Sequence, residues 1–169
     1  MKIAGMLLLI SGSTGMGIWM CQCMRQRIRY LEQMVWLFHF MESEVDYKKS
    51  GFVITFEEAA RRMDGPVKQM LYHAAKRLKE KDACFTEIWN EEVIWLWKHS
   101  ELKQEDIDSI RELGTDGYSD IRMQLMQIRM VREKLEETET KLKKEWAEKG
   151  KIYMCVGILS GMVVSIVLI

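Results

Sequence analysis

The residues of this sequence that could carry chemistry are few and stand apart from one another. His39 and His73 lie in apolar-rich stretches, and neither has a second ligand at metal-binding spacing. Glu42 and Glu44 are two residues apart, so on a helix they point to different faces and make a poor general acid and base pair. The Cys-Gln-Cys run at 21–23 has no further ligands nearby. We therefore expect no catalytic residue, no cofactor-binding residue and no metal site.

Sequence motifs of known chemistry are missing as well. The glycine-rich stretch at 12–17 is followed by no Lys-Ser/Thr pair and preceded by no strand, which argues against a phosphate-binding loop. There is no H-E-x-x-H, Walker A or G-x-S-x-G motif. The 25 basic and 25 acidic residues are interleaved, which argues against a surface that follows nucleic-acid phosphates. The sequence thus predicts a protein that is not an enzyme and binds no nucleic acid.

Two uncharged segments, at 3–20 and 152–169, are expected to form an N-terminal and a C-terminal transmembrane helix. Each has a length that extends roughly 27 Å as a helix, close to the hydrocarbon thickness of a bilayer. The first segment lacks a small-residue cleavage site, so we interpret it as a retained helix and not a signal peptide. Residues 21–151 would then form a domain between two membrane anchors.

Basic residues crowd the inner ends of both segments, whereas only Lys2 lies beyond them. This bias predicts that residues 21–151 are cytoplasmic and that both termini lie across the membrane. The basic residues concerned are Arg25, Arg27, Arg29, Lys141, Lys143, Lys144, Lys149 and Lys151.

Helical patterns fill the domain between the anchors. One proline, 14 methionines and few β-branched runs favour helices, so we expect an all-α cytoplasmic bundle of about six helices. A long helix of about 28 residues from Ile121 should pack on an antiparallel partner, because apolar residues such as Ile128 and Leu135 recur along it at coiled-coil spacing, with Arg132 at one of these positions. It would continue into the second anchor, with a break at Gly150 as an option. The other expected helices cover 28–48, 55–63, 66–78 and 102–113, and one opened by Asp82 or Thr86.

Residue types also predict how these helices begin. Thr55 and Glu58 have the spacing of a capping box, and Pro66 suits the first turn of a helix. Ser119 or Asp120 would cap the long helix.

The three tryptophans at 89, 95 and 97 have different predicted roles. Trp89 lies on the apolar stripe of its helix, which indicates a core position. Trp95 and Trp97 lie off that stripe, so they serve either an interface or additional core packing.

In the C-terminal anchor, Gly157 and Gly161 are four residues apart, which either permits close packing of another membrane helix or reflects the high glycine content of membrane helices.

The whole chain resembles the stage III sporulation protein AB family of endospore-forming bacteria. The run MESEVDY, which contains Glu44 and Tyr47, is similar to the family's L-E-x-E-I-x-Y. The run FTEIW, which ends at Trp89, resembles F-x-x-x-W, and the spacing of Gly117, Asp120 and Gln124 is the most specific match. Further similarities are FEEA at 56–59, GPV at 65–67 with Pro66, and KIY at 151–153 followed by Gly157 and Gly161.

The resemblance implies a non-catalytic platform subunit in the sporulation complex that links mother cell and forespore. Such proteins are similar to the inner-membrane platform protein of type II secretion and type IV pilus systems. The implied partners are a cytoplasmic secretion-type ATPase and other membrane subunits, with a homo-oligomer as an option. The implied location is the mother-cell membrane around the forespore.

Structural roles for three of the matched residues follow from their types. Gly117 would allow a tight turn, Asp120 would cap the long helix, and Gln124 would bond to a facing helix. Direct contact with a partner is the alternative for all three. For the whole protein, the alternative to a platform is a membrane-anchored sensor or regulator in sporulation signalling.

Overall fold

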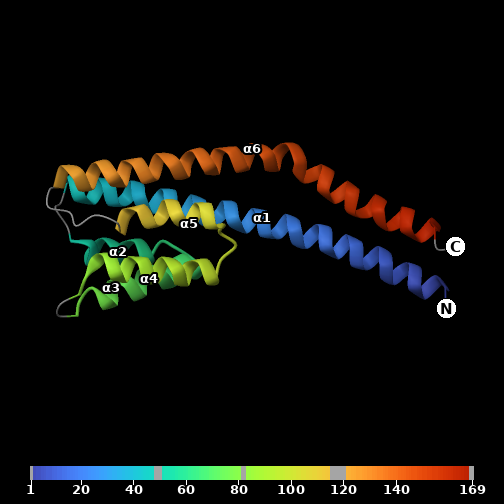
Figure 1. The fold of residues 1–169 in the computed structure, drawn as a ribbon, viewed down its shortest axis with the longest axis horizontal. Coiled ribbons are helices and arrows are strands. Elements are labelled where there is room, and N and C mark those ends of the chain that lie inside the picture. Colours follow the sequence, from blue (N-terminus) through green and yellow to red (C-terminus); the bar gives the residue numbers. More distant parts are fainter. Residues whose placement is uncertain (1, 48–50, 81–82, 115–120, 168–169) are drawn as a thin grey trace. The chain divides into compact units, whose positions relative to one another are not determined.

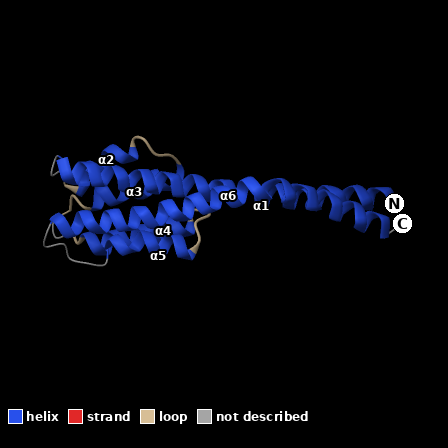
Figure 2. Ribbon diagram, turned by 90° about the horizontal axis from the view of Figure 1, so that it is seen from above, coloured by secondary structure: helices blue, strands red, loops and turns tan. Residues whose placement is uncertain are grey.

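The computed structural model describes residues 2–47, 51–80, 83–114 and 121–167 (Figure 1). Side chains are described at residue 12 and over 15–44, 51–80, 83–114 and 122–148. Within the described residues every regular element is a helix (Figure 2), which confirms the all-α prediction. The elements are α1 (Lys2–Tyr47), α2 (Phe52–Ala60), α3 (Gly65–Arg77), α4 (Phe85–Lys98), α5 (Gln104–Arg111), the 3-10 turn η1 (Glu112–Gly114) and α6 (Ile121–Val167).

The chain divides into two compact units. One contains residues 1–28 and 140–169, and the other contains residues 29–139. In the first unit the guanidinium of Arg25 lies 5.7 Å from the ring centre of Trp146, a cation–π contact between α1 and α6. The predicted anchor segments at 3–20 and 152–167 are helical, as parts of α1 and α6.

A search of the described residues finds no helix with the length and apolar character needed to cross a membrane. The two transmembrane spans, and the domain limits at 21 and 151 that depend on them, therefore stay predictions.

The unit of residues 29–139 is a helical bundle. Within this unit, Figure 1 shows α2 to α5 gathered along one side of the parts of α1 and α6 that belong to it. α2 packs on α3, α3 packs on α4, and α4 packs on α5 and η1. Glu42, near the end of α1, contacts Arg129 and Arg132, near the start of α6, which confirms that α6 has an antiparallel partner.

An aromatic cluster forms the centre of this bundle. Trp89 of α4 is fully buried, and its ring centre lies 5.7 Å from Phe56 of α2 and 6.3 Å from Phe38 of α1. Phe85 extends the stack, with its ring centre 6.0 Å from Trp89. Three helices that are distant in sequence thus meet at one indole ring, as the apolar stripe on α4 predicted for Trp89.

Two of the predicted helix starts are wrong. α2 begins at Phe52 with Gly51 as its N-cap, so Thr55 lies inside the helix, where its hydroxyl donates to the Gly51 carbonyl at 3.4 Å. α4 begins at Phe85 after Cys84, so Thr86 lies in the first turn. In both cases a phenylalanine ahead of the candidate cap takes part in packing, because Phe52 and Phe85 stack on each other, and this contact favours an earlier helix start. Asp82 lies outside the described residues.

Other boundaries agree more closely. Pro66 occupies the first turn of α3, as predicted, directly after Gly65, which has a φ of +60° that favours glycine. The helix expected over 102–113 is shorter, because α5 ends at Arg111 and the chain tightens into η1. α6 continues through Gly150 without a break.

Candidate functional site

The landmark tryptophan has a structural role. Trp89 is fully buried, and its indole N–H donates to the carbonyl oxygen of Ile110 at 3.0 Å. This bond ties α4 to the end of α5. Gly114 packs against the same ring, because a Cβ built on it would lie 2.8 Å from Cδ1 of Trp89. Trp89 is therefore a packing centre and is unavailable to a partner.

The other predicted landmarks have different outcomes. Glu44 is buried on α1 and has a polar partner, whereas Tyr47 is the last residue of α1 and its side chain lies outside the description. Gln124 makes no hydrogen bond with the described residues. The bond across to another element is made three residues later, where Gln127 donates to the Glu112 carbonyl at 2.9 Å.

For the other predicted glycines and for Asp120, the structure describes no side-chain or packing contacts. Gly117 and Asp120 lie outside the described residues, so their turn and cap stay predictions. Gly157 and Gly161 lie in the α6 backbone, without a described packing environment.

No metal site is present among the described side chains, where no three His, Cys, Asp or Glu residues group as ligands. His39 is exposed on α1. His73 lies beside Trp95, with ring centres 5.6 Å apart, and its Nδ1 is 3.7 Å from the Glu92 carboxylate. Both histidines are thus surface residues.

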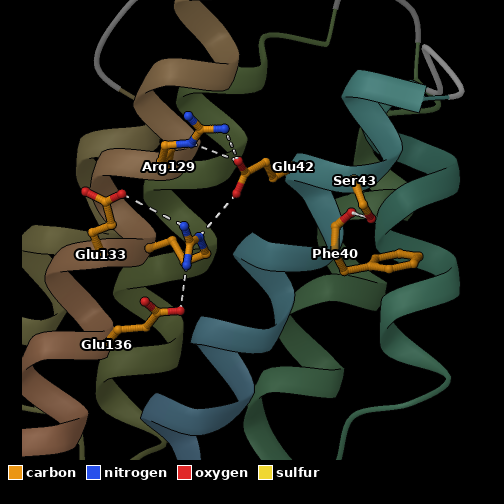
Figure 3. A network of polar contacts seen from close by, with 7 residues as sticks. Phe40, Glu42, Ser43, Arg129, Glu133 and Glu136 are labelled. Carbon is orange, nitrogen blue, oxygen red and sulfur yellow. Dashed lines mark hydrogen bonds and ion pairs between the residues drawn. The ribbon is translucent and has the colours of Figure 1, made fainter.

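A charged cluster that the sequence analysis missed joins α1 to α6 (Figure 3). The Glu42 carboxylate accepts from Arg129 at 2.7 and 2.9 Å and from Nε of Arg132 at 3.2 Å. Arg132 also donates to Glu136 at 2.6 Å, one turn along α6. The signal in the sequence was Arg132 itself, because an arginine at an apolar position of a helix seam needs a carboxylate partner.

The arginines change the acidity of Glu42. Burial alone would raise its pKa, but hydrogen bonds and positive charge from Arg129 and Arg132 outweigh burial and hold the pKa below its ordinary value. The ionised cluster therefore stabilises the fold at neutral pH. This contribution is lost as the pH falls through the lowered pKa of Glu42.

We expect the substitution Glu42→Gln to flatten the acid dependence of stability. Between pH 7 and pH 3 the free energy of unfolding of the unchanged chain should fall more steeply than that of the variant. Denaturant unfolding at a series of pH values measures both slopes. Glu133→Gln is the matched control, because Glu133 is 62% exposed and approaches Arg132 only to 3.9 Å. Equal slopes for Glu42→Gln and the unchanged chain would contradict the assignment.

The outer side of α3 and α4 carries aromatic and charged side chains. Trp95 is half-buried and stacks on His99 with ring centres 4.2 Å apart. Arg77 of α3 bridges to Glu91 at 2.7 Å and to Glu92 at 3.3 Å. Ile94 and Trp97, three residues apart on α4, are 37% and 44% exposed. The sequence did not decide whether Trp95 and Trp97 serve the core or an interface. In the structure Trp95 packs against the rings of His73 and His99, whereas Trp97 is partly exposed to solvent.

Comparisons with known proteins agree on one family. The sequence profile described as Stage III sporulation protein AB matches residues 2–169. Stage III sporulation protein AB of Bacillus subtilis (strain 168) is 20% identical over 169 residues, which cover 99% of each chain. A solved structure titled Stage III sporulation protein AB superposes with a TM-score of 0.67 at 19% identity, covering 72% of this chain and 96% of that chain. At this identity the superposition shows a shared fold.

Proposed function

The chain belongs to the stage III sporulation protein AB family, and from that premise we propose that it is a non-catalytic platform subunit of the sporulation complex between mother cell and forespore. Two terminal helices hold it in the mother-cell membrane, and its helical body docks the cytoplasmic secretion-type ATPase of the complex. A role in sporulation follows from the family, whose name refers to a stage of sporulation and to no reaction.

The observation that carries the docking proposal is the exposed pair Ile94 and Trp97 on α4. Tryptophan is enriched among residues that contribute most to protein interfaces, because it buries a large area with little loss of conformational freedom. The buried side of α4 is anchored through Trp89, so the pair lies on a helix that is packed into the bundle. A platform needs such a surface, whereas a sensor needs an element with two arrangements.

We expect Trp97→Ala to weaken binding of the full chain to its cognate ATPase by about tenfold or more, as for a central interface tryptophan. Calorimetric titration of the detergent-solubilised chain with the ATPase measures this effect. Tyr72→Ala is the matched control, because Tyr72 is a more exposed aromatic, at 64%, on α3. It should bind within about twofold of the unchanged chain.

Two results would count against the proposal. Saturable binding that survives Trp97→Ala would move the contact to another surface. A folded chain that binds no ATPase, but whose helical body changes arrangement with the state of the membrane complex, would favour the sensor.

A further inference from the structure

A cavity lined by polar side chains lies where α4, α5 and η1 meet. Its volume is about 400 Å³, and it opens to solvent. The described residues that line it are Thr86, Asn90, Asp108, Arg111, Glu112 and Gly114. A space of this size accepts a side chain of a partner or a small ligand.

Arg111 is held in a defined orientation at this cavity. Its Nε donates to Oδ1 of Asn90 at 3.1 Å. The Asn90 amide is itself oriented, because its Nδ2 donates to the Thr86 carbonyl at 2.9 Å. Two successive hydrogen bonds thus restrict the guanidinium, which lowers the entropy lost when a ligand binds to it.

The terminal nitrogens of Arg111 have no partner among the residues that the structure describes. The acids beside it are engaged elsewhere: Glu112 pairs with Lys134, and Asp108 accepts from Gln104 at 2.8 Å. Neither acid lies within ion-pair distance of Arg111 in the described part of the chain. Among the described residues, the cavity therefore contains one oriented cation, and neither of its two terminal amino groups is paired there.

We propose that this cavity binds a single carboxylate, supplied by an aspartate or glutamate side chain of a protein partner. A guanidinium with two free amino groups matches the two oxygens of a carboxylate in a bidentate pair. The open mouth of the cavity suits a side chain that projects from a polypeptide. Asn90 of the cavity lies one turn before Ile94 on α4, but the inference rests on Arg111 and does not depend on the ATPase.

Charge in the cavity selects against phosphate. A phosphate group carries about 1.5 to 2 negative charges at neutral pH, whereas a carboxylate carries one. Asp108, whose charge is not offset by an ion pair with a described residue, adds negative potential that opposes phosphate more strongly than it opposes a carboxylate. A monoanion is therefore a better match than phosphate to a cavity in which one arginine lies near the carboxylate of Asp108.

The test uses the full chain, labelled with ¹⁵N, in detergent micelles. The probes are the blocked tripeptides acetyl-Gly-Asp-Gly-amide and acetyl-Gly-Glu-Gly-amide. We expect saturable shifts of the Arg111 Nε–Hε signal, with a Kd on the order of millimolar for so small a contact. The neutral acetyl-Gly-Asn-Gly-amide, and inorganic phosphate at equal ionic strength, should bind at least about fivefold more weakly.

Three variants separate the proposed contact from general effects. Arg111→Gln should abolish saturable binding of the acidic peptides. Arg111→Lys keeps the positive charge but loses the planar guanidinium with its two amino groups, so it should weaken binding by at least about fivefold. Arg61→Gln is the matched control, since Arg61 is an exposed arginine at the end of α2, and it should bind like the unchanged chain. Thermal unfolding of each variant checks that the fold is retained.

Several outcomes would overturn the proposal. These are no saturation by either acidic peptide, equal binding of the neutral peptide, tighter binding of phosphate, or equal loss in Arg61→Gln. If Arg111→Gln does not fold, then full binding by Arg111→Lys would itself refute a bidentate contact.

Discussion

Replacing Trp89 with alanine is expected to lower the free energy of unfolding by about 3 to 5 kcal/mol, the usual cost of removing a large aromatic side chain from a core. The indole is fully buried and contacts aromatic rings on α1 and α2 as well as Phe85 on its own helix. Its removal leaves a large cavity, and it also leaves the Ile110 carbonyl without the donor at 3.0 Å. Since most single-domain proteins are stable by only about 5 to 15 kcal/mol, such a change threatens the whole bundle.

Trp97→Ala gives the matched control for this prediction, because it removes an equal side chain from an exposed position on the same helix. Denaturant unfolding followed by the helical circular dichroism signal should show a change of at most about 0.5 kcal/mol for Trp97→Ala. Trp89→Phe retains an aromatic ring and loses the N–H, so its loss of unfolding free energy should lie between those of Trp97→Ala and Trp89→Ala. Equal stability of Trp89→Ala and Trp97→Ala would show that Trp89 is not the packing centre.

The sequence predicted the parts of the fold that depend on helical periodicity. Trp89 is on the buried face of α4, and Ile128 and Leu135 are on the buried face of α6, because apolar spacing directly reports which side of a helix loses contact with water. Helix starts were less predictable. A hydroxyl at the right spacing marked Thr55 as a cap, but burial of Phe56 and stacking of Phe52 on Phe85 extend α2 past it. Tertiary packing outweighed a local capping preference of about 1 kcal/mol.

The candidate sites depend on contacts between residues that are distant in sequence. Glu42 meets Arg132 across 90 positions, and Asn90 meets Arg111 across 21. No spacing rule connects such pairs. Only the presence of Arg132 at an apolar seam position could have indicated one of them. The exposure of Trp97, in contrast to the stacking of Trp95 on His99, also required the packed structure.

Adding one methyl group at Gly114 is expected to lower the free energy of unfolding by about 1 to 3 kcal/mol, the usual cost of overpacking a core. A Cβ at this position would lie 2.8 Å from Cδ1 of Trp89 and 3.4 Å from Nδ2 of Asn90. Neither neighbour moves easily, because Trp89 is fully enclosed and bonded to Ile110, and Asn90 is held by Thr86 and Arg111. The strain should therefore also disturb the orientation of Arg111.

The control and a double substitution identify the source of this strain. Gly15→Ala adds the same methyl group inside α1 with no described atom within 4 Å, so stability should stay unchanged or rise slightly. If the clash with Trp89 is the cause, Gly114→Ala should cost less in a Trp89→Phe background, with a coupling of about 0.5 kcal/mol or more by denaturant unfolding. Additive effects would mean that Gly114 is constrained by something other than the indole. A stable Gly114→Ala chain that loses carboxylate binding would instead place the strain on Asn90 and Arg111, and would tie the cavity to the same packing that buries Trp89.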